Sequence, residues 1–149
     1  MRISYLLLRL VNKFFDTDKK TRYYGTDKQI FESEIHMIKA IKENEGIHVT
    51  GLANKLGITK GAVSQIIMKL EKKDLIRKEK DVYNQSKLVL KLTSSGEIAY
   101  INHEKLHKKL DDMISEILDK VSEENIEFLK VFLMSLEDRL EGFEENCNK

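Results

Sequence analysis

Proline and tryptophan are absent from this sequence of 149 residues, and cysteine occurs once, as Cys147. Without proline, long helices can run without the residue that breaks them most strongly. A single cysteine cannot form a disulfide within the chain, so we expect the reducing cytoplasm as the setting. At Cys147 we expect an ordinary thiol rather than a redox sensor.

The sequence also lacks a long hydrophobic run. Its first 15 residues are apolar only in short stretches, which Arg9, Asn12 and Lys13 interrupt, and no small-residue cleavage site follows. A helix that spans a bilayer needs about 20 apolar residues, and a signal peptide ends in small residues. We therefore expect an amphipathic helix here and no membrane as a partner.

Charge is abundant but unevenly distributed. The net charge is +1, with 34% charged and 41% hydrophobic residues, which is too apolar for a disordered chain and too charged for a membrane protein. Residues 55–91 carry ten basic and four acidic side chains, whereas residues 92–149 carry seven basic and fourteen acidic ones. The length fits one domain, and its basic middle suits a polyanion as partner.

Apolar periodicity predicts helices over residues 3–15 and 29–43, with a polar loop over residues 16–28. Thr50 is the predicted N-cap of a short helix over residues 51–56, which Gly57 closes. Thr59 is the predicted N-cap of the next helix, from Lys60 to about Lys73. Two short helices joined by three residues that include a glycine have the spacing of a helix-turn-helix.

Two short strands follow, over residues 75–80 and 87–92, with apolar residues at 88, 90 and 92 in the second. A hairpin directly after a helix-turn-helix is a wing. Helices from about residue 94 to 120 and from about 122 to 143 complete the chain. The predicted fold is therefore mainly α with a small β-wing, built on a winged helix-turn-helix core.

The helix that begins at Lys60 has two different faces. Ile66, Ile67 and Leu70 lie within about 60° of Val63 on a helical wheel, so we expect this side to be buried. The opposite side is small, polar or basic, which suits a helix that enters the major groove of DNA. The residues that we expect to contact DNA are Thr50, Thr59, Lys60, Gly61, Ser64, Gln65, Lys69, Lys72 and Lys87.

Each of these residue types has a chemical reason to be there. Gln65 can pair with adenine through two hydrogen bonds, while Ser64 serves a base or a phosphate. Gly61 lets the backbone come close to the duplex. The lysines bind phosphate or guanine, and the helix N-termini at the two threonines bind phosphate.

From about residue 33 to 96 the chain resembles the MarR family, through VTGLANKLGITKGAVSQIIMKLEKKDLI and the later LVLKLTSSGE. The marker Leu92-Thr93-x-x-Gly96 after the second strand is specific in this context. The resemblance implies one MarR-like domain over residues 1–149. It further implies a DNA-binding lobe over residues 29–96 and a homodimer held by helices in 1–20 and 97–149. The implied partner is double-stranded DNA with a palindromic operator, and each wing reaches a minor groove.

The wing departs from the family pattern. MarR wings usually carry Asp-x-Arg, but the matching positions here are Asn84, Gln85 and Ser86. Lys87 is the nearest cation, and lysine is less suited than arginine to a narrow minor groove. Discrimination between bases by this wing is therefore in doubt, although lysines at 78, 80 and 87 still supply charge.

Histidines offer a possible effector site. His103 and His107 are spaced i, i+4, which lets two imidazoles face one metal ion. The resemblance to the zinc-sensing branch of the family implies that His36 joins them, with Asp18 or Asp16 as the fourth ligand. The plain alternative is three surface or packing histidines. Zinc is thus a possible cofactor, with no role expected for His48.

A small aromatic or lipophilic effector is the competing hypothesis, with a cleft lined by Phe14, Phe15, Tyr23, Tyr24 and His36. Aromatic residues where helices meet are more often plain core. The sequence has no nucleophile–base–acid set, no glycine-rich phosphate loop and no HExxH, so we expect no enzyme. We expect a DNA-binding regulator, with repression as the expected sign. The alternative is a winged-helix protein-interaction module without DNA readout.

Overall fold

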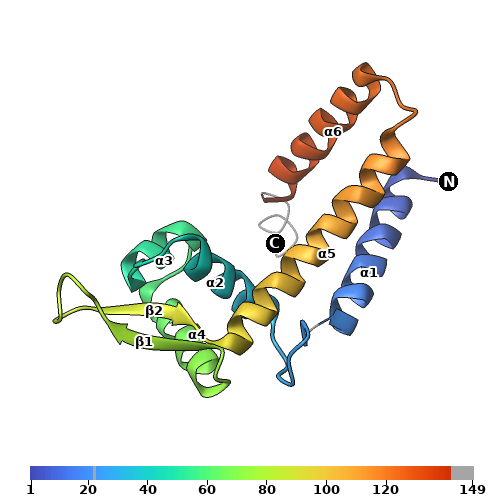
Figure 1. Cartoon of the computed structure of the whole chain (residues 1–149). Coiled ribbons are helices and arrows are strands. Elements are labelled where there is room, and N and C mark those ends of the chain that lie inside the picture. Colours follow the sequence, from blue (N-terminus) through green and yellow to red (C-terminus); the bar gives the residue numbers. More distant parts are fainter. Residues whose placement is uncertain (22, 142–149) are drawn as a thin grey trace, which may run out of the picture. The chain divides into compact units, whose positions relative to one another are not determined.

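A computed structural model describes residues 1–21 and 23–141, without the side chains of residues 15, 17–21 and 141. Six helices and one antiparallel hairpin lie within them, in the order that the sequence predicts (Figure 1). The elements are α1 (Ile3–Thr21), α2 (Glu32–Glu43), α3 (Val49–Leu56), α4 (Lys60–Lys72), β1 (Ile76–Lys80), β2 (Leu88–Leu92), α5 (Ser94–Leu118) and α6 (Glu123–Glu141). This mainly helical fold with a two-stranded wing confirms the predicted fold class.

The chain divides into two compact units, Met1–Leu106 and His107–Lys149. The predicted DNA-binding lobe of residues 29–96 lies wholly inside the first. Among the residues that the structure describes, none of the helices combines the length and the apolarity that crossing a bilayer requires.

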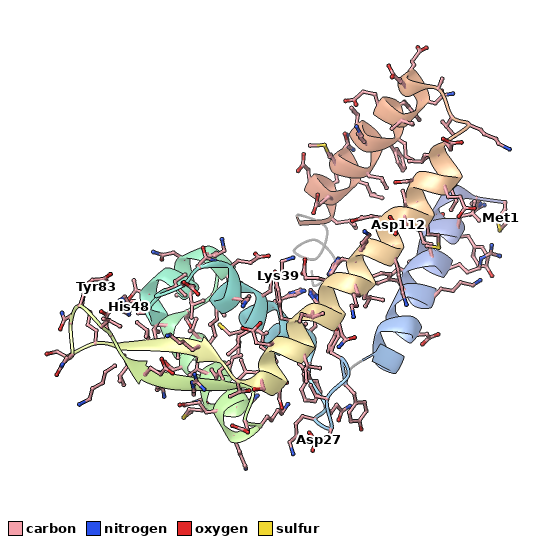
Figure 2. All side chains as sticks on the ribbon, viewed as in Figure 1. Met1, Asp27, Lys39, His48, Tyr83 and Asp112 are labelled. Carbon is pink, nitrogen blue, oxygen red and sulfur yellow. The ribbon has the colours of Figure 1, made fainter. Side chains whose placement is uncertain are left out.

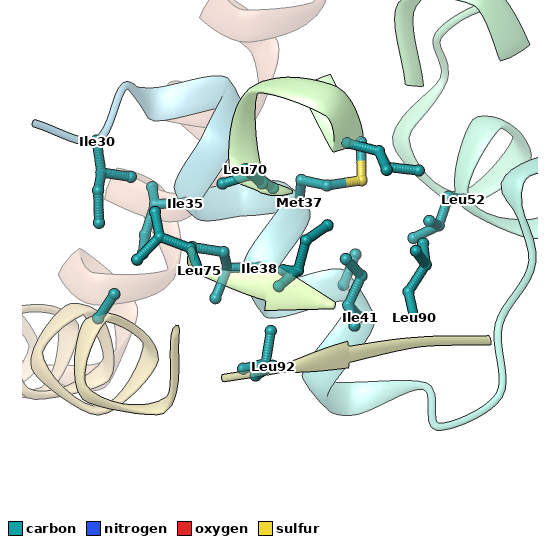
Figure 3. Packing of buried hydrophobic residues seen from close by; sticks show 14 of the residues in the cluster. Ile30, Ile35, Met37, Ile38, Ile41, Leu52, Leu70, Leu75, Leu90 and Leu92 are labelled. Atoms are coloured by element: carbon teal, nitrogen blue, oxygen red, sulfur yellow. The ribbon is translucent and has the colours of Figure 1, made fainter. Parts of the chain in front are cut away.

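The core of the first unit lies where α2 meets α3, α4 and the hairpin (Figure 3). Full burial of one aliphatic side chain contributes about 1.5–3 kcal/mol, so a cluster of this size fixes the helices against one another. Its most deeply buried members are Ile30, Ile35, Met37, Ile38, Leu52, Val63, Leu70 and Leu75.

The hairpin pairs Ile76 with Leu92 at its inner end and Lys80 with Leu88 at its outer end. Leu90 and Leu92 are buried, as the alternation predicts, but Leu88 is 54% exposed. The expectation for residue 88 was wrong: the neighbouring Val89 is buried instead, and Leu88 lines an open groove beside the first turn of α3.

The marker Leu-Thr-x-x-Gly joins the start of α5 to the turn before β1. The Thr93 amide donates to the Leu75 carbonyl at 3.1 Å, and its hydroxyl donates to the Asp74 carbonyl at 2.7 Å. A Cβ added at Gly96 would lie 2.0 Å from the Leu75 carbonyl oxygen. Only glycine therefore lets the helix approach this turn so closely.

Three predicted boundaries were wrong. The polar stretch after residue 15 continues α1 to Thr21, since it holds no residue that breaks a helix before Gly25. Conversely, α2 begins at Glu32 rather than residue 29. His48 and not Thr50 is the N-cap of α3: its backbone is extended and its carbonyl accepts from the Leu52 amide at 2.9 Å. Thr50 is an exposed residue of the first turn.

Candidate nucleic-acid interface

The two faces of α4 are oriented as its sequence predicts. Val63, Ile67 and Leu70 are at most 2% exposed, and Ile66 is half-buried against the core. The opposite side carries the exposed residues Lys60, Gly61, Ser64, Gln65, Met68, Lys69 and Lys72. One helix thus presents amide, hydroxyl and ammonium groups on a continuous outer face, and its other face holds it in the core.

The N-terminus of α4 is capped as predicted. The Thr59 hydroxyl oxygen accepts a hydrogen bond from the Ala62 amide at 3.1 Å. Next to it, Gly61 lies in open space: an added Cβ would meet only the Thr59 hydroxyl, at 3.9 Å. The protein's own packing therefore gives no reason for a glycine here, unlike at Gly96.

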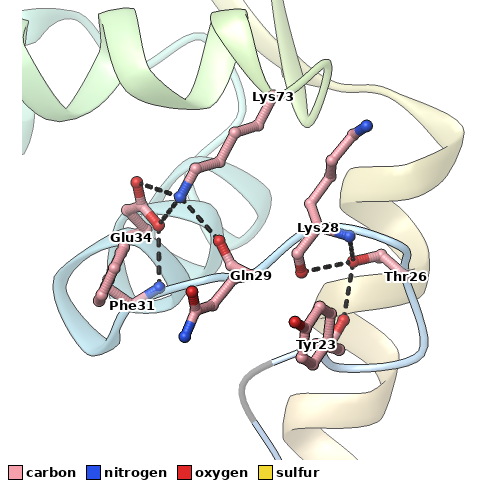
Figure 4. A network of polar contacts seen from close by, with 7 residues as sticks. All are labelled: Tyr23, Thr26, Lys28, Gln29, Phe31, Glu34 and Lys73. Atoms are coloured by element: carbon pink, nitrogen blue, oxygen red, sulfur yellow. Dashed lines mark hydrogen bonds and ion pairs between the residues drawn. The ribbon is translucent and has the colours of Figure 1, made fainter.

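A partly buried ion pair fixes the C-terminal end of α4 to α2 (Figure 4). Lys73, directly after α4, donates to both carboxylate oxygens of Glu34 at 2.6 and 2.8 Å and to the Gln29 carbonyl at 2.7 Å. The Glu34 carboxylate also accepts from the Phe31 amide at 2.8 Å, which caps α2. Sequence reasoning missed this pair, although a Glu three residues into a helix is a known capping signal.

Much of the positive charge on the hairpin is neutralised. Lys78 contacts Glu71 of α4 at 2.7 Å, and Glu79 lies 2.7 Å from Arg77 and 3.0 Å from Lys91. The pKa of Glu79 lies below its ordinary value because Lys91 and Arg77 donate hydrogen bonds to its carboxylate. Lys78, which we expect to supply charge to DNA, thus has an acidic partner in the free protein.

The first turn of α3 lies beside the outer end of the hairpin. His48 and Leu88 contact each other, with 3.4 Å between the imidazole Nδ1 and the Leu88 carbonyl oxygen. A shallow groove there is lined by residues 46–51 together with Lys87 and Leu88. Thr50 and Lys87, two residues predicted to contact DNA, thus line the same groove.

Comparison with known proteins agrees with this arrangement. Residues 30–85, which run from the start of the core through the wing turn, match the profile described as the MarR family. The chain belongs to the MarR family. The match covers the helix-turn-helix and the first wing strand, which carry most of the predicted contacts.

Two curated Bacillus subtilis relatives are similar to this MarR-family chain. The HTH-type transcriptional regulator PchR is 34% identical over 74% of the chain, and the uncharacterized HTH-type transcriptional regulator YhjH is 30% identical over 70% of it. The matched regions span 65% and 60% of those proteins, which is less than two thirds of each. Their names describe regulators and no enzyme, in agreement with the absence of a catalytic set in the sequence.

A solved structure extends the similarity of this MarR-family chain to nearly its full length. It is the crystal structure of Streptococcus pneumoniae FabT in complex with DNA, which is 26% identical. The TM-score is 0.70, and the match covers 93% of this chain and 94% of FabT.

The predicted zinc ligands of this MarR-family chain are only partly described. The rings of His36 and His103 lie 5.9 Å apart, edge to face. His103 is 4% exposed and packs against the Tyr24 ring at 5.7 Å. Among the described side chains no three His, Cys, Asp or Glu residues gather as a metal-binding group, and the Asp18 side chain lies outside that set. The zinc site stays a prediction.

An ion pair beside these histidines ties α2 to α5. Lys39 donates to Glu104 at 2.7 Å, and Glu104 lies 3.4 Å from His103 Nδ1. The pKa of Glu104 is below its ordinary value, mainly because Lys39 donates this hydrogen bond. Of the aromatic residues predicted to line an effector cleft, Tyr24 is buried in the core, whereas Phe14 and Tyr23 are exposed. The Phe15 side chain and Cys147 lie outside the described residues.

Proposed function

We propose that this MarR-family chain is a sequence-specific DNA-binding transcriptional regulator, with repression as the sign that we expect. The supporting observation is α4, whose apolar side is buried while Gly61, Ser64, Gln65 and the lysines lie exposed on the other. A helix of this kind offers hydrogen-bonding side chains to base edges and cations to phosphates. FabT, whose structure was solved with DNA, shares the fold over nearly the whole chain.

We further propose that the chain acts as a homodimer on a palindromic operator. Exposed apolar side chains on the terminal helices support this: Leu8 and Leu10 on α1 are each 64% exposed, and Phe128 on α6 is 70% exposed. Large apolar surfaces of this kind are usually covered in an oligomer. Two-fold symmetry would give each half of the operator one copy of α4.

Binding to the promoter next to the chain's own gene tests the proposal, measured by fluorescence anisotropy at several salt concentrations. Gln65→Ala should relax sequence preference, because it removes an amide that can read adenine. Lys69→Ala should weaken binding to every duplex and lower the slope of log affinity against log salt by about 1. If both variants bind each duplex as the parent does, α4 is not the reading helix.

A second function, a protein-interaction module, is favoured by one observation: Glu71 and Glu79 form ion pairs with three cations of the hairpin. The same titration separates the two functions. No shift of the promoter duplex at low salt, where electrostatic binding is strongest, would support the interaction module.

The effector that we propose is zinc, or else a small aromatic or lipophilic compound, bound near His36 and His103. The support for this position is the 5.9 Å spacing of the two rings. The side chains that the structure describes at this position supply two imidazole ligands, whereas zinc sites in proteins usually have about three or four protein ligands. Metal analysis of the purified protein and of His36→Ala, whose side chain is exposed, tests zinc. If the zinc-free protein has full DNA affinity and added zinc does not change that affinity, zinc is excluded and the organic compound is the effector that we propose.

A further inference from the structure

The turn at the end of the wing has a defined conformation. The Asp81 carboxylate accepts hydrogen bonds from the amides of Tyr83 at 2.7 Å and Asn84 at 3.0 Å. The Asp81 amide donates to the Lys87 carbonyl at 2.9 Å, and the Lys87 amide donates to the Asn84 carbonyl at 2.8 Å. The pKa of Asp81 is lowered by the two amide hydrogen bonds. These contacts hold the backbone of residues 82 and 83 at the outside of the turn.

Two apolar side chains occupy that outer position. Val82 is 86% exposed and Tyr83 is 99% exposed, which are the highest values among the large hydrophobic side chains that the structure describes. Figure 2 shows Tyr83 at the outer end of the hairpin. One exposed hydrophobic residue is ordinary, but two neighbours at the end of an ordered turn form a surface suited to contact with another molecule.

The charges around this tip favour a nucleic acid as that molecule. Lys80 and Lys87 flank the turn and are exposed, whereas residues 84–86 are neutral. Lys87 also lines the groove beside the N-terminus of α3, so the tip continues the surface that we propose for DNA. The cations on either side of the turn match phosphates, and the Asp81 carboxylate is bound by two backbone amides. Residues 82–86 carry no charged side chain, so they can enter a groove between the phosphates.

The minor groove has the chemistry that Tyr83 requires. Apolar side chains of several DNA-binding proteins enter it and lie between or against base pairs. At A·T pairs its floor carries only acceptors, adenine N3 and thymine O2, which a phenol hydroxyl can satisfy. A G·C pair adds the guanine amino group, which projects from the floor.

We propose that Tyr83, with Val82 beside it, is the minor-groove contact of this wing and reads A·T pairs through packing and one donated hydrogen bond. The proposal rests on the proposed function. A contact of this kind contributes to affinity without releasing a counterion, so it is independent of salt.

Anisotropy titrations of Tyr83→Ala and Tyr83→Phe against the promoter duplex test this proposal. Tyr83→Ala should weaken binding about tenfold, as expected for partial burial of an aromatic side chain, with the salt slope unchanged. Tyr83→Phe should lose only about threefold, because it keeps the packing. Tyr83→Arg should make the slope steeper by about 0.9. The matched control is Tyr23→Ala, an exposed tyrosine outside the wing, which should bind DNA as the parent does when both are measured without an effector.

Base substitution in the operator locates the contact. At the positions next to each half-site, A·T→G·C changes should abolish the difference between the parent and Tyr83→Ala. With inosine·cytosine pairs, which lack the guanine amino group, the difference in affinity between the parent and Tyr83→Ala should remain. Retention in both duplexes would mean that Tyr83 does not read the minor groove.

The outcomes separate this inference from the proposed function. A parent that binds no duplex overturns both. A parent that binds, with Tyr83→Ala equal to it at every salt concentration, overturns the role of Tyr83 alone. If Tyr83→Ala binds DNA as the parent does but has a different sedimentation coefficient, the tip makes a contact between protein chains. This result also overturns the proposed role of Tyr83 in DNA binding.

Discussion

Gly96 and Gly61 have opposite surroundings, so alanine at these two positions should change the free energy of unfolding in opposite directions. At Gly96 an added Cβ would lie 2.0 Å from the Leu75 carbonyl oxygen and 3.2 Å from Leu92 Cβ. At Gly61 its nearest contact would be 3.9 Å away. Alanine should therefore be disruptive at residue 96 and harmless to folding at residue 61.

The expected magnitudes follow from these distances. Relief of the Gly96 contact requires α5 and the turn to separate by about 1 Å, which would stretch the two hydrogen bonds of Thr93. Overpacking of this kind costs about 3 kcal/mol in the free energy of unfolding. Gly61→Ala should instead add about 0.5 kcal/mol, because alanine loses less backbone freedom when it enters a helix.

Urea unfolding followed by circular dichroism measures both changes, at a fixed protein concentration because oligomers unfold in a concentration-dependent way. With a denaturant slope of about 2 kcal/mol/M, Gly96→Ala should move the midpoint down by about 1.5 M. Gly61→Ala should be slightly more stable than the parent and yet bind promoter DNA about tenfold more weakly, because its Cβ would lie on the face that we propose for DNA. A Gly96→Ala midpoint equal to the parent's would refute the packing argument.

Three further predictions concern the rest of the chain. Glu34→Gln should lower the free energy of unfolding by about 2 kcal/mol, because it leaves Lys73 without its carboxylate partner. Phe128→Glu should weaken the proposed dimer about 30-fold in sedimentation equilibrium, because it puts a charge at an interface. The Asp81 carboxylate, whose pKa is lowered, stabilises the wing turn fully above its ordinary value of 3.8 and loses this effect as pH falls through the lowered value. The NMR shift of the Tyr83 amide should therefore change only below about pH 4.

Each of these has a control. For the ion pair, Lys73→Met in the Glu34→Gln background should cause little further loss, and an equal second loss would show that the pair is not coupled. For the dimer, Lys130→Glu on the same helix should leave association unchanged. For the turn, Asp81→Asn should remove the pH-dependent step, and its persistence would assign the step to another group.

Periodicity predicted much of the fold because burial acts on whole faces of helices. The α4 faces, the Thr59 cap and the hairpin were predictable since each depends on a residue pattern within one short continuous segment. The glycine marker before α5 was recognised as a motif, but its reason, the contact of Gly96 with the Leu75 carbonyl, joins residues distant in sequence.

Two of the errors share one physical origin, which is that polarity does not determine local conformation. A run of charged residues was predicted to be a loop, yet it extends α1 to Thr21. Thr50 was chosen as an N-cap for its hydroxyl, yet the helix begins one residue after His48. The ion pairs of Lys73 with Glu34 and of Lys78 with Glu71 join separate elements, so no local pattern identifies them.

The central claim, that the exposed face of α4 binds DNA, is tested most directly by NMR spectra of the labelled chain with and without its promoter duplex. We predict that the amides of Gly61, Ser64, Gln65 and Lys69 shift on addition of the duplex while those of buried α2 residues change little. Shifts confined to residues outside α3, α4 and the wing would contradict the claim.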